Sequence, residues 1–500
     1  MGPGSASENL NALDIPLSPN CHWVPVSWGM TWPTPAMPLL WGCLVWGTGC
    51  MDVDPELARA ERMREVLVTA DRVFLSREAG LVADKYAAMA GDPYAFLRGT
   101  VPWYFAELAR PDPSRPRTSF LSNAASTAVL VVGDPHPENC STLATTAVAD
   151  PLEVAQPVEF VDLDAAGWGP WLLDVRRAAL GMHTLTAQLP GCSAECRQDA
   201  VSALVERYSE TIVVGALDES PDGRFIEELL EEARDEGPAQ SRLDREAPVV
   251  EDQRRMALIL DEVAALTPEE ARLFADVIDT MRDDLPPGFR VLDVARRYGR
   301  GISSMPAIRF SAVVDRGDEG PQDDALLDVR EVLDPIALPG RAIEAPGVFE
   351  NNGQRVMRAA RTMWTRADAD PLAAHGCLGR LCFKSLSKHA WFQDVERSKV
   401  IEEWMDGELD ETDLADLGAD LGGVLARSHL RGGVVDGRDS GKAIRDDIQE
   451  GGGPDALVEE LLRDTGTDHK RLIADHALFV GLLSSHGPVL GVRDAVEHHP

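Results

Sequence analysis

Two short apolar runs, each ending in an acidic turn, constrain this 500-residue chain more than any other feature. The first, AVLVVGDPHPEN, spans 128–139, and the second, PVEFVDLD, spans 157–164. A continuous apolar run of this length that stops at turn-forming residues is typical of a buried strand. A loop at the end of such a strand holds side chains rigidly while leaving them accessible. The pattern predicts two strand-end loops whose polar side chains meet at one site.

The first loop carries an acid and an amide five residues apart, Asp134 and Asn139. The acid can accept a proton from an attacking hydroxyl, and the amide oxygen can bind a divalent cation that holds phosphates. The alternative is a turn in which both residues only cap the backbone. His136 is predicted to organise the loop, and its alternative role is that of a ligand in a metal-dependent hydrolase.

The second loop carries two carboxylates, Asp162 and Asp164, which share one face of an extended segment. Carboxylates this close repel each other unless a cation lies nearby, and hard oxygen ligands suit Mg²⁺ or Mn²⁺. Asp164 could instead cap the turn that follows. Asp174 lies one turn into the next apolar helix, where it either accepts hydrogen bonds from backbone amides of the first loop or complements the helix dipole.

The remaining periodicity predicts an α+β protein. Helical spacing is found over 52–110, 171–232, 352–364 and 413–430 and near the C-terminus, and β-like alternation over about 290–335 indicates a small antiparallel sheet. The charged, aperiodic stretch 233–255 is predicted to be a linker or an exposed loop.

Several segments resemble known families. GDPHPEN and VDLDAAGWGPWLLDVRRAA resemble the catalytic and metal-binding segments of aminoglycoside and choline kinases, which are relatives of the protein kinases. Five further segments resemble, in order, blocks of the bacterial domain-of-unknown-function 2252 family, so that the resemblance runs from about 85 to 433. These segments are KYAAMAGDPYAFLRGT (85–100), DVARRYGRGISSM (293–305), ALLDVREV (325–332), NGQRVMRAAR (352–361) and LARSHLRGG (425–433).

The resemblance implies a role for each candidate residue. Asp134 is the catalytic base, Asn139, Asp162 and Asp164 are the metal ligands, and Arg98, His136 and Asp174 support the site. The nucleotide is bound by Gly299, Gly301 and Arg330, together with Ser303 and Ser304, which stand where the family has a third glycine. Arg330 stands where kinases have a phosphate-binding Lys, and Glu350 is the nearest candidate for its acidic partner. Arg is not equivalent to Lys at such a position.

The order of the segments implies a kinase-like two-lobe fold with circularly permuted connectivity, because here the catalytic loop precedes the Gly-rich turn. Permutation is tolerated when it reconnects surface loops and leaves packed contacts unchanged. The expected divisions are a leader over 1–57, a catalytic half of the large helical lobe over 58–285, a small nucleotide-binding lobe over 286–400, and helices completing the large lobe over 401–500.

The expected activity is transfer of the γ-phosphate of ATP, with Mg²⁺ or Mn²⁺, to a hydroxyl of a small-molecule acceptor. Three alternatives stay open: a nucleotide-binding pseudokinase without turnover, a metal-dependent hydrolase built from Asp134, His136 and Asp162, and a nucleotidyl transferase. The sequence names neither the acceptor nor the oligomeric state.

The net charge limits the kinds of partner that the protein can bind, and its apolar stretches and cysteines indicate its cellular compartment. With 48 basic residues, only six of them Lys, against 83 acidic ones, the formal net charge is −35, which disfavours nucleic acid and anionic lipid as partners. No integral membrane span is expected, because the apolar stretch MPLLWGCLVWGTGC (37–50) is too short to cross a bilayer. A cytoplasmic location is expected, with lipid attachment at Cys50 as the alternative. The eight cysteines, including the close pairs Cys192 and Cys196, and Cys377 and Cys382, are expected to be reduced thiols.

Overall fold

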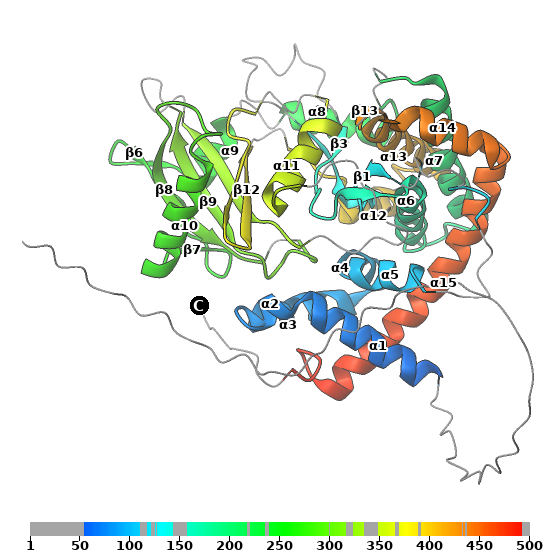
Figure 1. The fold of residues 1–500 in the computed structure, drawn as a ribbon, viewed down its shortest axis with the longest axis horizontal. Helices are drawn as coiled ribbons and strands as arrows, with labels where there is room; N and C mark the ends of the chain where they lie inside the picture. Colours follow the sequence, from blue (N-terminus) through cyan, green and yellow to red (C-terminus); the bar gives the residue numbers. More distant parts are fainter. Residues whose placement is uncertain are drawn as a thin grey trace, which may run out of the picture. The chain divides into compact units, whose positions relative to one another are not determined.

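An antiparallel sheet lies in the middle of the chain, with helices before and after it (Figure 1). Residues Val53–Pro500 form one compact unit, and the other unit, Met1–Asp52, which includes Cys50, lies outside the described residues. The computed structural model describes residues 55–110, 118–121, 126, 128–143, 158–217, 221–235, 240–299, 301–316, 324–334, 349–365, 370–388, 392–432, 434–435 and 438–492.

The sheet has six strands in the order β11–β12–β10–β9–β8–β7, and all neighbours are antiparallel. Side chains alternate between its faces, so that Phe310, Ala312 and Leu327 pack against helix α10 while Arg309 and Arg330 belong to the other face. The strands are β7 (Val263–Ala265), β8 (Arg290–Arg297), β9 (Arg309–Asp315), β10 (Ala325–Glu331), β11 (Ala374–Leu378) and β12 (Leu381–Lys388). The predicted sheet is confirmed, and the hairpin β11–β12 extends it beyond the predicted range.

Helices make up most of the rest, which confirms the α+β class. Before the sheet lie α1 (Pro55–Ala70), α2 (Arg72–Leu75), α3 (Ala79–Gly91), α4 (Pro93–Gly99), α5 (Val101–Leu108), α6 (Trp171–Thr186), α7 (Ala194–Val214) and α8 (Arg224–Asp235). Helix α9 (Gln240–Glu246) also precedes the first strand of the sheet. Within and after the sheet lie α10 (Pro268–Met281), α11 (Asn352–Met363), α12 (Arg397–Asp406), α13 (Glu411–Arg431), α14 (Ser440–Glu450) and α15 (Pro454–His486).

Helices α7 and α13 pack closely because α13 carries glycines where it meets α7. A side-chain carbon at Gly418 would lie 2.2 Å from the carbonyl oxygen of Ala200, and one at Gly422 would lie 2.0 Å from that of Leu204. The two backbones therefore touch, and a larger residue at either position would push the helices apart. This contact fixes α13, whose last turn carries His429.

The linker predicted over 233–255 is wrong. This stretch contains the end of α8, helix α9 and the short strands β5 (Val249–Val250) and β6 (Gln253–Arg254). Ion pairs give this stretch its regular structure, and they leave no periodic pattern in the sequence. Glu246 forms ion pairs with Arg242, Arg297 and Lys388, the last two from strands β8 and β12. Burial alone would raise the pKa of Glu246, but Lys388 and Arg242 lower it to about 2. The ion pairs with Arg297 and Lys388 tie the segment to the sheet.

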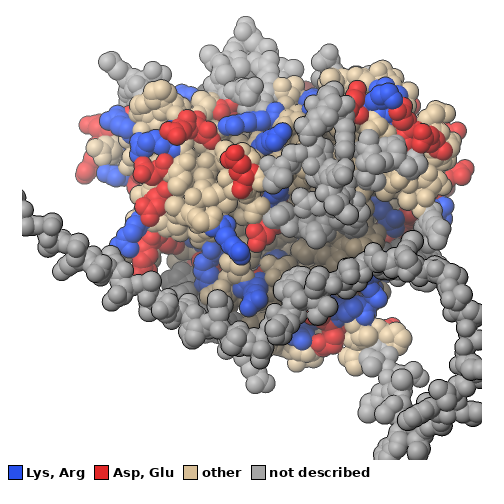
Figure 2. Space-filling view, viewed as in Figure 1, with Lys and Arg blue, Asp and Glu red and all other residues tan. Residues whose placement is uncertain are grey.

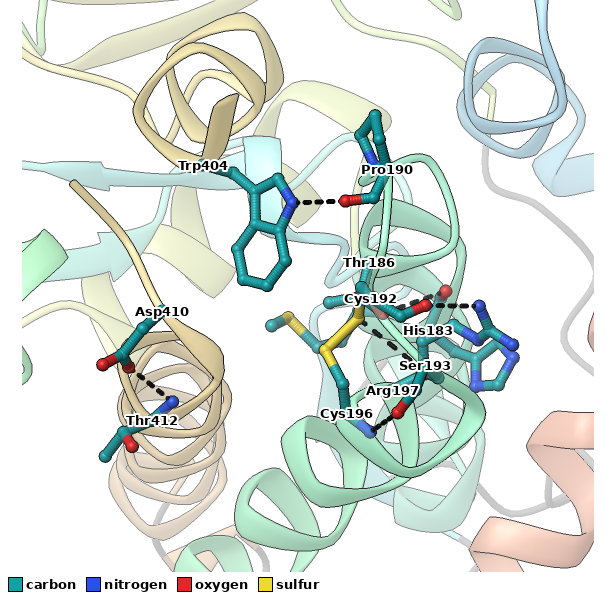
Figure 3. The surroundings of a disulfide bond; sticks show 11 residues. His183, Thr186, Pro190, Cys192, Ser193, Cys196, Arg197, Trp404, Asp410 and Thr412 are labelled. Carbon is teal, nitrogen blue, oxygen red and sulfur yellow. Dashed lines mark hydrogen bonds between the residues drawn. A yellow bond between two sulfur atoms is a disulfide. The ribbon is translucent and has the colours of Figure 1, made fainter. Parts of the chain in front are cut away.

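The prediction of reduced thiols is also wrong for two pairs. Cys192 and Cys196 form a disulfide at the start of α7, where Ser193 caps the helix by accepting a hydrogen bond from the backbone N–H of Cys196 (Figure 3). Cys377 and Cys382 stand directly opposite each other in the hairpin β11–β12 and form the second disulfide. Helix initiation and strand pairing bring the Cα atoms to 5.5 and 4.0 Å, close enough for a disulfide to form. Neither effect is visible from cysteine spacing alone.

Acidic and basic side chains are interspersed on the face shown in Figure 2, despite the net charge of −35. Within the described part of the chain, none of the helices combines the length and the apolar character that crossing a bilayer requires.

Candidate active site

Two pairs of three-residue strands fold the two acidic loops onto each other. Strand β1 (Val129–Val131) pairs with β4 (Gly167–Gly169), and β2 (Cys140–Thr142) pairs with β3 (Val158–Phe160). The turn after β1 needs Gly133, whose φ is 89°, and a side-chain carbon there would lie 2.3 Å from the carbonyl oxygen of Ala165. The loop backbones therefore touch, and Asp134 and Asp162 line the same cavity.

Asp134 is 7% exposed and is held by a fully buried arginine. Arg177, in the second turn of α6, donates from Nε to Asp134 Oδ1 at 2.8 Å and from Nη2 to the carbonyl oxygen of Leu97 at 2.7 Å. Burial raises the pKa of Asp134, the charge of Arg177 opposes this, and the nearby charge of Asp162 adds to it, so that the net shift is upward. A carboxylate with a raised pKa takes up a proton more readily, as a general base must.

Asn139 and His136 stiffen the loop around Asp134. Asn139 lies at the end of a short 3₁₀ turn, η1 (Pro137–Asn139), and donates from Nδ2 to the backbone oxygen of Asp134 at 2.9 Å. Nε2 of His136 lies 3.7 Å from Asp134 Oδ2. Burial and the positive charges of Arg98 and Arg177 lower the pKa of His136 well below its usual value. The positive charges of Arg98 and Arg177 disfavour a further cation at the ring, which fits the predicted role of loop organiser better than that of metal ligand.

Asp174 anchors the first loop through its backbone. Its carboxylate accepts hydrogen bonds from the N–H groups of Val132 at 2.6 Å and Gly133 at 2.9 Å. His429 Nε2 lies 3.0 Å from the same carboxylate, and its Nδ1 lies 2.8 Å from the hydroxyl of Tyr208. Of the two roles considered for Asp174, the structure shows hydrogen bonding to the loop amides. His429 is completely buried, so its contact with Asp174 supports the loop from the protein interior.

Among the described residues, Asp164 forms an ion pair with a cation, whereas Asp162 forms none. Lys384 Nζ lies 2.9 Å from Asp164 Oδ1. Burial alone would raise the pKa of Asp164, but Lys384 and Arg330 outweigh it and hold the pKa below its usual value. The other oxygen, Oδ2, is buried and accepts no hydrogen bond from the described residues. Arg355 of α11 holds the backbone of this loop by donating to the carbonyl oxygens of Asp164 at 2.8 Å and Ala166 at 2.6 Å.

Three cations form a row across neighbouring strands on the sheet face opposite α10. Arg309 of β9 pairs in register with Arg330 of β10, which pairs in register with Lys384 of β12, so all three side chains leave the same face. The charges of Asp162 and Asp164 act on both Arg309 and Arg330. Arg330 forms an ion pair with Asp328 at 3.4 Å, not with Glu350 as the sequence suggested.

The sequence analysis identified Arg330 but missed Arg309 and Lys384. Lys384 left a usable signal, since it is one of only six lysines in the chain. Arg309 left none, because it is one of many arginines and only strand register places it beside Arg330.

The Gly-rich turn reaches the site through its serines. Ser303 and Ser304 line the cavity, whereas Gly299 and Gly301, with φ of 68° and 75°, are not among the described residues that line it. Ser303 Oγ donates to the backbone oxygen of Arg98 at 3.1 Å, and the Arg98 side chain forms an ion pair with Glu138 at 2.7 Å. Arg98 therefore connects the Gly-rich turn to the loop that carries Asp134.

The shared cavity encloses about 880 Å³, near the upper end of the roughly 300–1,000 Å³ typical of small-molecule sites. Asp134, Asn139, Asp162 and Asp164 line one part of it. Helices α1, α2, α3 and α5 line another part, and the segment that follows β10 closes the side towards the sheet.

The oxygen atoms in this cavity fit a divalent cation. No group of three or more His, Cys, Asp or Glu side chains is arranged to hold a metal within the described ranges. Mg²⁺ rarely uses such a cage, because it keeps several waters and binds through one or two carboxylates together with substrate phosphates. The buried Asp164 Oδ2 without a hydrogen bond is the kind of atom that a cation would satisfy. Asn139, Asp162 and Asp164 thus supply a suitable set of hard ligands.

Comparison with known proteins identifies a family for this chain, but the description of that family names no activity. No curated protein and no solved structure was found to match the chain. The model of a family described as "Uncharacterized protein conserved in bacteria (DUF2252)" matches residues 77–481, which include every candidate residue discussed above. The chain belongs to the DUF2252 family.

Proposed function

We propose that the protein binds ATP with a divalent cation and transfers the γ-phosphate to a hydroxyl of a small-molecule acceptor. One observation carries this proposal. The carboxylates of Asp134, Asp162 and Asp164 line one cavity, and Asp164 forms an ion pair with Lys384, which stands in register with two further cations on the sheet. An acid for the acceptor hydroxyl, oxygen ligands for a metal and cations for phosphates are the parts that phosphoryl transfer requires.

Each residue has a defined part in the reaction. The acceptor oxygen forms a bond to the γ-phosphorus while the bond from that phosphorus to the β–γ bridging oxygen breaks. Asp134 takes the hydroxyl proton, and ADP leaves with the bridging oxygen. Lys384, Arg330 and Arg309 compensate the phosphate charge, and Arg177 keeps the Asp134 carboxylate oriented.

A bound Mg²⁺ or Mn²⁺ would neutralise charge on the phosphates and help to orient them. Asn139, Asp162 and Asp164 are the residues that would hold it. Asp164 is shared with Lys384, so a cation there would compete with or displace that ion pair.

The arrangement of strands supports a kinase-like fold with permuted connectivity. A Gly-rich turn between two antiparallel strands, a third strand with a central cation and then a helix is the order found in protein kinases. Here β8, the turn 298–304, β9, β10 with Arg330, and α11 follow the same order. The loop with Asp134 precedes them in the chain, and circular permutation accounts for this difference.

A pseudokinase is the second candidate, and two contacts favour it. Arg330 and Lys384 are already engaged by Asp328 and Asp164. Cellular location also bears on the choice between the two candidates, because an ATP-dependent enzyme needs the ATP of the cytoplasm. The two disulfides favour an oxidising compartment instead, and lipid attachment at Cys50 would favour the same compartment.

Thermal unfolding with and without ATP and MgCl₂ tests the proposal, together with ADP release in which water serves as acceptor. The wild type should be stabilised by Mg·ATP. Asp134→Asn should keep that stabilisation and lose turnover by roughly 10²–10⁴, as expected for a general base. Stabilisation without any ADP release in the wild type would favour the pseudokinase, and no stabilisation would exclude nucleotide binding.

A further inference from the structure

The part of the cavity formed by helices α1, α2 and α5 is lined mainly by apolar side chains, which we call the apolar wall. None of them belongs to the phosphate or metal groups described above. The wall is made by Val66, Val73, Phe74, Val101, Pro102 and Ala106. Val73 is 55% exposed, so its side chain is available to a ligand.

The charged side chains beside the apolar wall neutralise each other. Lys85 Nζ donates to both oxygens of Asp71, at 2.7 and 2.8 Å, and both residues are buried. Arg77 forms an ion pair with Glu331 at 2.6 Å. Glu65 also lines the cavity, but its side chain is exposed and forms no ion pair with the described residues. Glu65 is therefore the one of these charged groups that is left to attract a cation, and the Glu65→Gln variant described below tests that possibility.

The apolar wall adjoins the proposed base. Val101, at the start of α5, packs in one cluster with Val131, the last residue of β1 and three residues before Asp134. Arg177 links the Asp134 loop to α4, which directly precedes α5, since it donates both to Asp134 and to the carbonyl oxygen of Leu97. A molecule lying along the wall would have one end beside the Asp134 carboxylate.

We infer that the apolar wall binds the phosphate acceptor, and that the acceptor is a neutral alcohol with an apolar body. This inference rests on the proposed function for the fate of the hydroxyl, which reaches Asp134 while the apolar body covers the wall. Polyols and sugars fit poorly, because each additional hydroxyl would lose its hydrogen bonds to water without gaining a partner. Cationic alcohols fit poorly because Asp71 is already neutralised by Lys85, and because Glu65 is exposed, where water weakens an ion pair.

Direct binding tests this inference without relying on catalysis. Isothermal calorimetry on the full chain, without ATP, should show binding of 1-octanol and weaker or undetectable binding of glycerol and choline. Ala106→Trp fills the cavity and should weaken octanol binding by about tenfold or more. Ala87→Trp is the matched control, because Ala87 is exposed on α3 and does not line the cavity. If Ala106→Trp does not fold, Val66→Trp on α1 replaces it.

The outcomes separate this inference from the proposed function. Equal octanol binding by wild type and Ala106→Trp, or no octanol binding by wild type, would overturn the apolar acceptor site. Choline binding that disappears in Glu65→Gln would overturn it in favour of a cationic acceptor. Stabilisation by Mg·ATP, measured on the same samples, tests the phosphotransferase alone. Its absence beside intact octanol binding would refute phosphoryl transfer and retain the alcohol site.

Discussion

Lys384 Nζ lies 2.9 Å from Asp164 Oδ1, which joins the sheet to the second acidic loop across 220 residues of sequence. Both side chains are buried, and Lys384 is the main opposite charge acting on Asp164. Removing one member of a buried ion pair leaves an uncompensated charge, whereas replacing both members can be nearly neutral.

Lys384→Met should therefore destabilise the protein by about 3–5 kcal/mol, and the double variant Lys384→Met/Asp164→Asn should recover most of that loss. Urea unfolding measures both. Mg·ATP should stabilise neither variant, because the phosphate-binding cation is missing. Recovery of ATP stabilisation in the double variant would show that Lys384 acts only on Asp164.

Stability at low pH should depend on Asp164. Its pKa is lowered in the folded state, so its contribution is fully present above its unfolded pKa of about 3.9 and is lost as pH falls through the lower folded pKa. Asp164→Asn cannot titrate, and its stability should fall less steeply than that of wild type below about pH 4. Urea unfolding at several pH values checks this, and parallel curves would contradict it.

Arg177 should control the protonation of Asp134. It is a positive charge that opposes the upward shift, so Arg177→Gln should raise the pKa of Asp134 further. NMR of the ¹³C-labelled aspartate carboxyls, assigned by comparison with Asp134→Asn, reads this pKa directly. If ADP release is measurable, its acidic limb should move to higher pH in Arg177→Gln. An unchanged Asp134 titration would show that the 2.8 Å contact has little electrostatic effect.

Asp174→Ala should destabilise the protein by about 2–4 kcal/mol, because the buried N–H groups of Val132 and Gly133 lose their acceptor. Asp174→Asn keeps one oxygen acceptor and should cost less. Hydrogen exchange at the two amides is the specific measurement, since they should exchange faster in Asp174→Ala than in a variant of equal stability mutated elsewhere. Unchanged protection would rule out Asp174 as their anchor.

Each disulfide closes a short loop, so removing either should cost about 2 kcal/mol. Cys192→Ser/Cys196→Ser and Cys377→Ser/Cys382→Ser, compared by urea unfolding, measure this. Alkylation followed by mass spectrometry on protein from cells should leave these four thiols unmodified unless a reductant is added. Full alkylation without reductant would support the reduced, cytoplasmic state.

The local parts of the site could be read from the chain. Asp134, Asn139, Asp162 and Asp164 stand at the ends of apolar runs that form β1 and β3, and Leu172, Val175 and Met182 mark the buried side of α6 by their spacing. Such features depend on neighbours within a few residues, so periodicity and turn chemistry suffice to find them.

Tertiary structure decided which distant residues meet. Strand register places Arg309, Arg330 and Lys384 in one row, and only the packing of the sheet on the second loop brings Lys384 to Asp164. The pairing of cysteines and the ordering of 240–254 by Glu246 depend in the same way on contacts between elements. Ion pairs and register join residues far apart in sequence, and a single sequence carries no periodic signal for a contact of that kind.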